Sequence, residues 1–281
     1  MRWQGRRQSS NIEDRRGISP RGMLGGGIGT IIIILAVLLL GGDPTSLLQN
    51  IQTTNQTTTT EYNQTAEEKE LTQFISVVLA ETENVWHKIF SDIGAEYREP
   101  KLVLFTGSVQ SACGVAGAST GPFYCPGDEK LYIDLSFYKE LQSKFKAPGD
   151  FAMAYVVAHE VGHHIQNLLG TMEKVQRLRS RLSEEEYNQY SVRLELQADF
   201  YAGVWAHYTD KIEGILEEGD LEEALNAASA VGDDNIQKKM QGYVVPESFT
   251  HGTSEQRKRW FYKGYRTGDI RQGDTFNTEN L

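Results

Sequence analysis

The sequence predicts a predominantly helical α+β domain preceded by one transmembrane helix, and three patterns carry this prediction. Apolar residues recur with helical spacing over several long segments. Two short segments, residues 102–105 and 130–135, have the apolar content and alternation of strands. From residue 23 to residue 42 the chain has twenty consecutive residues without a charge, enough for a helix to cross a bilayer. We therefore expect helices packed on a small antiparallel sheet, with the membrane segment ahead of them.

The helical pattern recurs along most of the domain. The segments that show it most clearly are residues 66–94, 150–170, 172–182, 183–208 and 255–266. Residues 211–241 are expected to add one or two further helices, with Asp220 capping one of them and no catalytic residue among them. Phe123-Tyr124 is expected to face the strand at 130–135 in a hairpin. Residues 267–281 are polar and are expected to be frayed.

Charge is distributed unevenly along the chain. The 281 residues are 39% hydrophobic, which is enough for one sizeable core, and the net charge is −10. Residues 1–22 carry six arginines against Glu13 and Asp14, so the remainder is strongly acidic. An acidic domain repels backbone phosphates, which argues against a nucleic-acid partner. Because the arginines lie on one side of the apolar run, the positive-inside rule places the N-terminus in the cytoplasm and the domain in the periplasm or at the cell surface.

These patterns divide the chain into four parts. Residues 1–22 are expected to be a cytoplasmic basic leader and residues 23–42 a transmembrane signal anchor. Residues 43–65 are too poor in apolar side chains to pack and are expected to be a polar tether. Residues 66–281 are expected to form the folded domain. The competing interpretation of the apolar run is a cleaved signal peptide, but no small-x-small cleavage site follows it.

Cys113 and Cys125 are the two cysteines of the sequence, and both fall in the part expected to be exported. In an oxidising compartment they are expected to form a disulfide that pins the loop between the strands. Their spacing is not C-x-x-C and no histidine lies near them, which argues against a metal site at this pair.

The helix predicted at residues 150–170 contains the pattern H-E-x-x-H at His159, Glu160 and His163. Residues four apart on a helix project side by side, so the two histidines can bind one ion. Neutral imidazole suits Zn²⁺, and Glu160 can act as the general base that takes a proton from zinc-activated water. His164 points to another side of the helix and is expected at its outer face or beside the ligands. The alternative is a structural helix whose histidines bind no metal.

A zinc ion held by two histidines needs a third protein ligand and an open position. Gln166 and Leu169 stand where H-E-x-x-H-x-x-G-x-x-H enzymes have glycine and the third histidine, so this ligand must come from further along the chain. Glu195 is the best candidate, because Glu195 and Asp199 are neighbouring carboxylates on an apolar helix and need a cation. Asp199 is expected to accept the free ring N–H of a ligand histidine. The alternative partner for both carboxylates is Arg193 or another cation.

Two further histidines stand outside this pattern. His251 lies in a loop before the last helix and is expected either to donate a hydrogen bond to the oxyanion that forms at a peptide carbonyl, or to be a structural loop residue. His87 lies in the first helix and is expected to be a surface or structural histidine.

Four motifs in this order resemble the bacterial family of neutral zinc metallopeptidases. They are Gly121–Pro126, Ala158–His164, Glu195–Asp199 with Ala202–Trp205, and Thr250–Gly252 with Glu255–Arg257. The resemblance covers roughly residues 70–276 and extends to the single N-terminal anchor. It implies a zincin-like metalloprotease domain with a gluzincin-like site, in which His159, His163 and Glu195 bind zinc and Glu160 is the general base. It does not imply a particular substrate.

The sequence departs from the family pattern at two positions. Cysteine usually follows Gln-Ala-Asp and usually precedes Asp-Thr-Phe in this family, whereas Phe200 and Gly273 stand at these positions here. We infer that the two positions form a second disulfide in relatives and that this chain dispenses with it. Cys113–Cys125 would then be its one disulfide.

The expected function is therefore zinc-dependent hydrolysis of peptide bonds, with a protein or peptide as substrate and one N-terminal helix as the membrane contact. Two alternatives remain open at this stage. One is a non-catalytic, zinc-stabilised scaffold, and the other is an interaction protein that presents its acidic surface without zinc. The presence of Glu160 beside the histidines favours the enzyme, because a purely structural zinc site needs no base.

Overall fold

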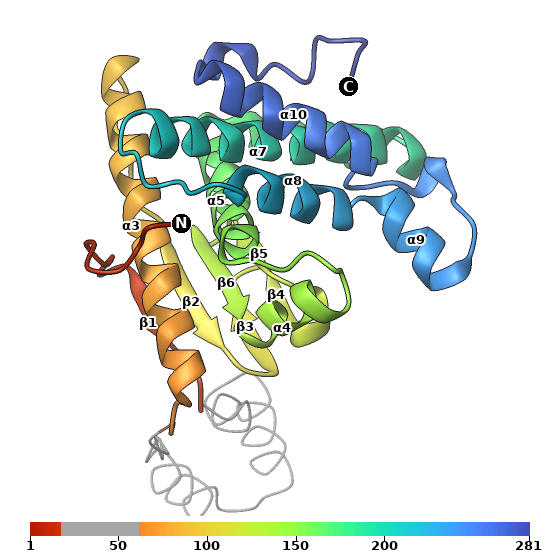
Figure 1. The fold of residues 1–281 in the computed structure, drawn as a ribbon. Helices are drawn as coiled ribbons and strands as arrows, with labels where there is room; N and C mark the ends of the chain where they lie inside the picture. The colour runs from red at the N-terminus through yellow and green to blue at the C-terminus, as the bar shows by residue number, and fades with distance from the viewer. Residues whose placement is uncertain (18–61) are drawn as a thin grey trace, which may run out of the picture.

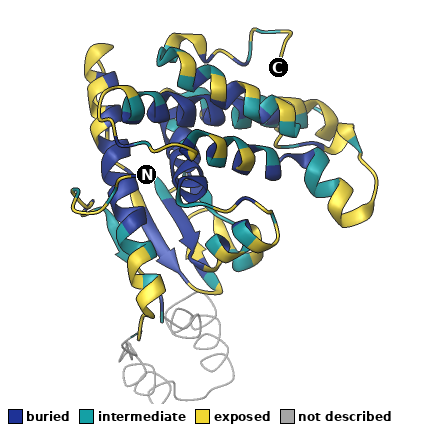
Figure 2. Ribbon diagram, in the orientation of Figure 1, coloured by how far each residue is buried: buried dark blue, intermediate teal, exposed yellow. Residues whose placement is uncertain are grey.

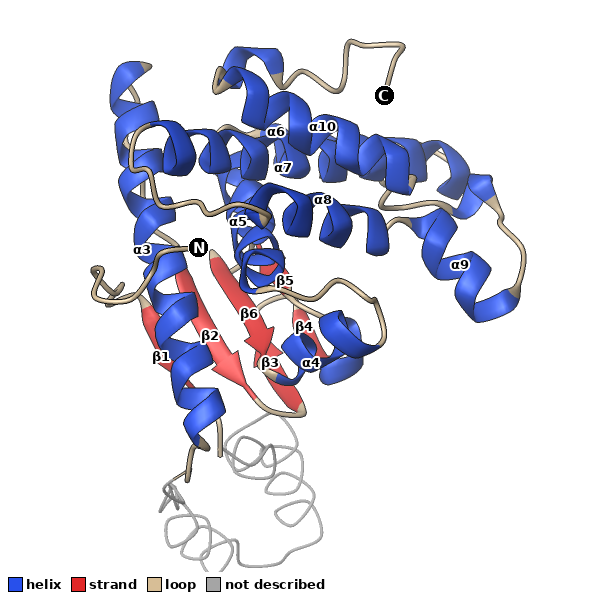
Figure 3. Ribbon diagram, in the orientation of Figure 1, coloured by secondary structure: helices blue, strands red, loops and turns tan. Residues whose placement is uncertain are grey.

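The computed structural model describes residues 1–17 and 62–281, in which a helical body packs against a small sheet (Figures 1 and 3). The longer helices are α3 (Ala66–Asp92), α5 (Asp150–Leu168), α7 (Glu184–Lys211), α8 (Asp220–Ala230), α9 (Asp233–Gln241) and α10 (Ser254–Thr267). Two short helices, α4 (Ser136–Ser143) and α6 (Thr171–Gln176), join them. The prediction of a predominantly helical domain with a small sheet is confirmed, although α4 was not predicted and α6 is shorter than the helical pattern of residues 172–182.

The two longest helices begin with reciprocal caps. The side chain of Thr65 accepts from the backbone N–H of Glu68 and the Glu68 carboxylate accepts from the backbone N–H of Thr65, which satisfies two amides at the start of α3. Ser183 and Glu186 make the same arrangement at the start of α7, where the S-x-x-E spacing favours it. Both helices are therefore fixed at their first turn and can carry side chains to defined positions along about 40 Å of axis.

The main sheet has four strands in the order β1-β2-β6-β5. Their bounds are Ile12–Asp14 for β1, Lys101–Phe105 for β2, Lys130–Asp134 for β6 and Phe123–Cys125 for β5. The predicted hairpin of β5 and β6 is confirmed, because Phe123 pairs with Tyr132 in antiparallel register. The prediction of an all-antiparallel sheet is wrong, since β2 runs parallel to β6 and β1 runs parallel to β2. A long connection returns the chain from the end of β2 to the opposite end of the sheet, and parallel pairing requires such a crossover.

The two faces of the sheet pack against different structures. Leu102, Leu104 and Ile133 point into the main core with α3 and α5. Val103 and Phe105 point the other way, into a smaller cluster that contains Val109 of the hairpin β3 (Ser108–Ser111) and β4 (Gly114–Gly117). Burial on both faces explains why the β2 sequence is continuously apolar and does not alternate. Figure 2 shows the resulting buried layer between the sheet and the helices.

Residues 1–17 belong to the folded unit. They lie along α3 and β2 (Figure 1), and residues 12–14 form the edge strand β1. The predicted separation of this basic segment from the domain at residue 66 is therefore corrected. The physical reason is that its arginines are ion-paired with carboxylates of the domain, such as Arg6 with Glu81 at 2.8 Å, and these partners are not visible in the local sequence.

The predicted transmembrane segment 23–42 and residues 43–61 of the predicted tether lie outside the described residues, as do residues 18–22 of the leader. Among the helices formed by residues 1–17 and 62–281, none has the length and apolar character needed to span a membrane.

Covalent and polar contacts fix two further regions. The predicted disulfide between Cys113 and Cys125 is present and ties the end of the β3–β4 turn to strand β5. The expectation that residues 267–281 are frayed is wrong. Thr275 is fully buried, and Gln197 Nε2 donates to the carbonyl of Gly273 at 2.8 Å. Arg193 also donates to the carbonyls of Thr275 and Thr278, so hydrogen bonds from α7 hold the tail without a second disulfide.

Candidate metal centre

The site lies where α5 crosses α7, and a glycine allows the two helices to approach closely. A Cβ atom added at Gly162 would lie 2.8 Å from the carbonyl oxygen of Ala198, a contact that no larger residue can make. Gly162 directly precedes His163, and Ala198 lies three residues after Glu195. The absence of a side chain at Gly162 therefore brings the ligand candidates of the two helices within reach of each other.

Three predicted side chains converge at this crossing. The ligand atoms of His159, His163 and Glu195 all lie within 4.8 Å of one another. The Nε2 atom of His159 is 3.1 Å from Glu195 Oε2, and that of His163 is 3.3 Å from Glu195 Oε1. Two imidazole nitrogens and one carboxylate are a donor set that suits zinc, with room for a further ligand.

The other ring nitrogen of His159 is held by a buried polar network. Its Nδ1 lies 2.9 Å from Asp199 Oδ1, and because a carboxylate only accepts, Nδ1 carries a proton and Nε2 is the nitrogen that can bind a metal once its own proton is lost. Asp199 is fully buried and also accepts from Tyr155 Oη at 2.5 Å and from Arg257 Nε at 2.7 Å. This position of Asp199 is the one the sequence suggested, but its cation is Arg257 and not Arg193.

The second histidine is oriented by an uncharged group. His163 Nδ1 lies 2.9 Å from Gln166 Oε1. The amide nitrogen of Gln166 donates to the carbonyl of Leu194 at 2.6 Å, which fixes the oxygen toward the histidine. His163 Nδ1 is therefore the donor, and its Nε2 faces the same point as that of His159. In both histidines Nδ1 is thus held by its partner, and Nε2 is left as the nitrogen for a metal.

Buried charges set the protonation of the metal-free site. Burial would lower the pKa of His159, but the charge of Asp199 and hydrogen bonds to Asp199 and Glu195 raise it to about 9. Burial would raise the pKa of Glu195, yet the charge of His163 and hydrogen bonds from both histidines hold it well below its usual value. The pKa of Asp199 is likewise lowered against the effect of burial, chiefly by Arg257. The two carboxylates remain ionised, as a cation site requires.

Glu160 differs from every other carboxylate of the site. It is 7% exposed, yet it makes no hydrogen bond or ion pair with any residue in the described parts of the chain. The oxygens of Glu160 are not among the fully enclosed unpaired atoms of the described chain, so the carboxylate keeps contact with solvent and is left free to act on a bound molecule. Its place beside His159 on α5 gives it access to a molecule bound at the three converging ligands.

His251 reaches the site on a loop between α9 and α10. The loop lies close to α7, since a Cβ atom added at Gly252 would be 3.1 Å from Val192. Asp233, the first residue of α9, accepts backbone N–H groups of residues 250–252 and lies 3.1 Å from His251 Nδ1. Partial burial would lower the pKa of His251, but the hydrogen bond to Asp233 and the charge of Glu195 raise it. The imidazole is half exposed and is held as a hydrogen-bond donor.

The remaining predicted residues lie away from this centre. His164 is fully buried between the sheet and α5, with Nδ1 3.0 Å from Tyr124 Oη and Nε2 2.6 Å from the carbonyl of Arg98, so the expectation of an outer-face residue is wrong. His87 is a surface histidine paired with Glu99, as expected.

A family comparison matches the description "Putative neutral zinc metallopeptidase" over residues 1–276 of the chain. The chain belongs to this zinc metallopeptidase family. Uncharacterized protein YpfJ of Escherichia coli strain K12 is 48% identical over 286 residues, which cover 98% of this chain and 99% of YpfJ. Uncharacterized proteins Mb2605 of Mycobacterium bovis and Rv2575 of Mycobacterium tuberculosis H37Rv are each 41% identical over 219 residues, covering 74% of this chain and 73% of their own. No solved structure matches the chain.

Membership of the zinc metallopeptidase family implies zinc, and the described residues fit this ion. The three converging side chains are nitrogen and oxygen ligands of the types that zinc prefers, and both histidines direct Nε2 to the same point. An additional acidic cluster of Asp150, Asp220 and Glu223 offers carboxylates only, which suits hard cations and not a catalytic zinc.

Three residues that shape the site were not predicted from the sequence. Gln166 lies three positions after His163 and therefore on the same helical face, a signal that could have identified it. Arg257 falls inside one of the family motifs, but local sequence gives no sign that it reaches Asp199. Asp233 lies in the segment 211–241, where no catalytic residue was expected. It positions His251 through contacts between residues 18 positions apart in the chain, and this pairing has no local sequence signature.

Proposed function

We propose that this chain is a zinc-dependent endopeptidase that uses Glu160 as its general base. One observation carries the proposal: Glu160 is buried without a partner in the described chain, next to three side chains whose ligand atoms converge. A structural zinc site has no need of an unpaired carboxylate beside its ligands. The family description supports the same reaction class, and the substrate would be a protein or a peptide.

Each residue of the site has a distinct role in this proposal. His159, His163 and Glu195 would hold the ion, which when bound lowers the pKa of water and polarises a carbonyl group. Glu160 accepts a proton from the attacking water and later gives it to the nitrogen of the cleaved peptide bond. Asp199 and Gln166 keep the ligand histidines in the required tautomer and orientation.

His251 would stabilise the negative charge that develops on the peptide oxygen. Its Nδ1 faces Asp233, so Nε2 is free to donate to a substrate, and the raised pKa favours the protonated form that can donate from both nitrogens. Asp233 fixes the loop through three backbone N–H groups and the ring through Nδ1. His251 is thus the proposed oxyanion donor and Asp233 its positioning residue.

The decisive experiment compares the purified chain with Glu160→Gln. The substitution keeps the shape of the side chain and removes its ability to accept a proton, so turnover of an unfolded protein substrate should fall by about 10²–10⁴-fold. Zinc content should stay at the level of the parent, because Glu160 is not one of the converging ligands.

Two results would contradict the proposal. If Glu160→Gln cleaves the substrate at the parent rate, Glu160 is not the base. If the zinc-loaded parent cleaves none of a broad panel of unfolded proteins and peptide libraries, the non-catalytic zinc-stabilised scaffold becomes the better description. A chain that binds no zinc at all would instead favour an interaction protein.

A further inference from the structure

The N-terminal segment, residues 1–17, supplies cations to two deeply buried carboxylates of α3. Glu81 and Glu83 are each 1% exposed. Arg6 Nε lies 2.8 Å from Glu81 Oε1, and Arg7 Nη2 lies 2.8 Å from Glu83 Oε2. Asn11 Nδ2 adds a hydrogen bond to Glu83 at 3.0 Å. Without these partners, two ionised groups would be buried beside the apolar core with no cation to compensate them, which is strongly unfavourable.

The same segment completes the sheet. Strand β1 pairs in parallel with β2, with Ile12 opposite Leu102 and Asp14 opposite Leu104. The pairing includes the residues just before and just after β1. The amide of Leu102 donates to the carbonyl of Asn11 at 2.8 Å, and the amide of Arg15 donates to the carbonyl of Leu104 at 2.8 Å. Removal of the segment would expose the backbone edge of the apolar strand β2, which is a hazard for aggregation.

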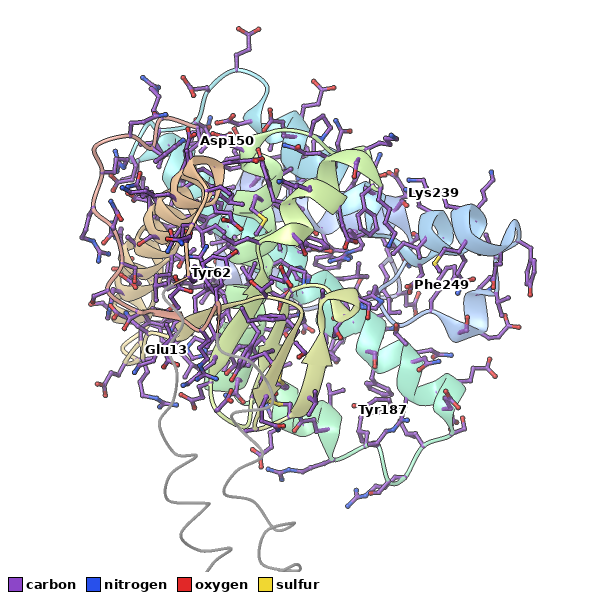
Figure 4. The ribbon with its side chains drawn as sticks, turned by 90° about the horizontal axis from the view of Figure 1, so that it is seen from below. Glu13, Tyr62, Asp150, Tyr187, Lys239 and Phe249 are labelled. Carbon is purple, nitrogen blue, oxygen red and sulfur yellow. A yellow bond between two sulfur atoms is a disulfide. The ribbon has the colours of Figure 1, made fainter. Side chains whose placement is uncertain are left out.

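The segment also ends beside the point where the described chain resumes. The guanidinium of Arg16 lies 5.1 Å from the ring centroid of Tyr62, and Gln64 Nε2 donates to Asp14 Oδ2 at 3.2 Å. Arg16 has no exposed side-chain surface. Glu13 and Tyr62 are labelled on the same part of the molecule in Figure 4, and β1 lies beside α3 in Figure 1.

We infer that residues 1–17 and residues 62–281 lie on the same side of any membrane that this chain contacts. A chain that crosses a bilayer once has its two flanks separated by a hydrocarbon layer of about 30 Å. Strand pairing, buried ion pairs and the Arg16–Tyr62 contact cannot form across that distance. The expectation of a cytoplasmic N-terminus with an extracytoplasmic domain is therefore incompatible with this fold.

The inference changes the interpretation of the N-terminal arginines. The positive-inside rule treats them as free charges that stay in the cytoplasm. In the structure Arg6, Arg7 and Arg15 are paired with Glu81, Glu83 and Glu13, and Arg2 donates to the carbonyl of Gly214 at 2.7 Å. Arg6 and Arg7 face carboxylates of α3, Arg15 pairs within the segment and Arg2 bonds to the turn after α7. These charges therefore have structural partners and do not report the orientation of the chain. The inference is independent of the proposed peptidase activity.

Thiol labelling of the full chain in intact cells tests the inference directly. Ser10→Cys reports the N-terminal segment and Glu218→Cys reports the domain, since both positions are exposed. The native cysteines form a disulfide and leave no free thiol of their own. A membrane-impermeant maleimide should label both variants before permeabilisation or both only afterwards, with a cytoplasmic thiol protein as the leakage control. Labelling of one position before permeabilisation and of the other only after it would overturn the inference.

Charge exchange in the purified full chain tests the contact itself. Arg6→Glu and Glu81→Arg should each lower the melting temperature, and the double variant Arg6→Glu with Glu81→Arg should recover at least half of the larger loss. The matched control is Arg98→Glu, which disrupts a more exposed pair with Glu129 and should have a smaller effect. If Arg6→Glu leaves the melting temperature unchanged, or the double variant shows no recovery, the packing that supports the inference is absent.

Discussion

Two pairs of buried or partly buried carboxylates, Glu81 with Glu83 on α3 and Glu195 with Asp199 on α7, meet different kinds of partner. The α3 pair faces arginines of the N-terminal segment, which stay charged at any relevant pH. Of the α7 pair, Asp199 is paired with Arg257, but Glu195 faces the Nε2 atoms of two histidines. These nitrogens can lose their protons to solvent and bind a metal instead. A buried carboxylate that is paired with arginine is therefore explained by the fold alone, whereas one that faces the ligand nitrogens of histidines indicates a metal site.

The largest expected effect comes from the same substitution made in both pairs. Glu195→Gln should weaken zinc binding by more than about 100-fold, because an uncharged amide replaces an anionic ligand. Loss of a residue that only hydrogen-bonds to a ligand already lowers metal affinity by about 10–100-fold. Glu83→Gln should leave zinc affinity unchanged and lower the free energy of unfolding by about 1–3 kcal/mol, since it weakens buried hydrogen bonds and an ion pair. Metal-competition titration and denaturant unfolding measure the two quantities.

This prediction separates the two regions sharply. Equal zinc affinity of the parent and Glu195→Gln would place the third ligand elsewhere. A loss of zinc binding in Glu83→Gln, measured where that variant is still folded, would show that α3 and the metal site are coupled and that the contrast drawn between the pairs does not hold.

A smaller effect is expected from the groups that orient the two histidines. Asp199→Asn should lower zinc affinity by about 10–100-fold, because Asp199 makes a charge-assisted hydrogen bond to His159 and anchors Arg257. Gln166→Met removes a neutral hydrogen bond to His163 and should have the smaller effect of the two. Isothermal titration with zinc measures both, and a larger loss in Gln166→Met than in Asp199→Asn would contradict this ranking.

Local sequence was sufficient for features whose determinants lie on one element. The H-E-x-x-H helix, the Ser183 cap and the β5–β6 hairpin follow from spacing within single segments. The position of Glu195 was suggested by the need of a buried carboxylate for a cation, and the structure brings it to the two histidines. These inferences succeed because the relevant periodicity is short.

Local sequence failed where the determining partner is far away in the chain. Arg6 is 75 residues from Glu81, so its role in the core had no local signal and its charge suggested a membrane leader instead. The docked C-terminal tail depends on Arg193 and Gln197 of α7, which its own polar composition could not reveal. The parallel pairing of β2 with β6 depends in the same way on the path of the connection between them.

The last prediction concerns pH, because His159, a partner of Glu195 and Asp199, can titrate, whereas the arginine partners of Glu81 and Glu83 cannot. The pKa of His159 is raised to about 9 in the metal-free protein, where burial is outweighed by Asp199 and Glu195. A raised pKa stabilises the fold fully below the unfolded value of about 6.5, and this contribution is lost as the pH rises toward 9. Zinc needs the neutral imidazole, so its affinity should rise by up to about tenfold per pH unit over the same interval. Stability of the metal-free chain and affinity for zinc should thus change in opposite directions.

Unfolding of the metal-free chain and chelator-competition titrations between pH 6 and pH 9 measure these two trends. In Asp199→Asn the group that raises the pKa of His159 most is gone, so the rise in zinc affinity should end closer to pH 6.5. The arginine partners on α3 do not titrate in this range, so Arg6→Glu should lower stability by the same amount at pH 6 and pH 9. A zinc affinity that is constant above pH 6.5 in the parent would contradict the prediction. It would mean that His159 is already neutral there and that Asp199 does not keep the imidazole of His159 protonated.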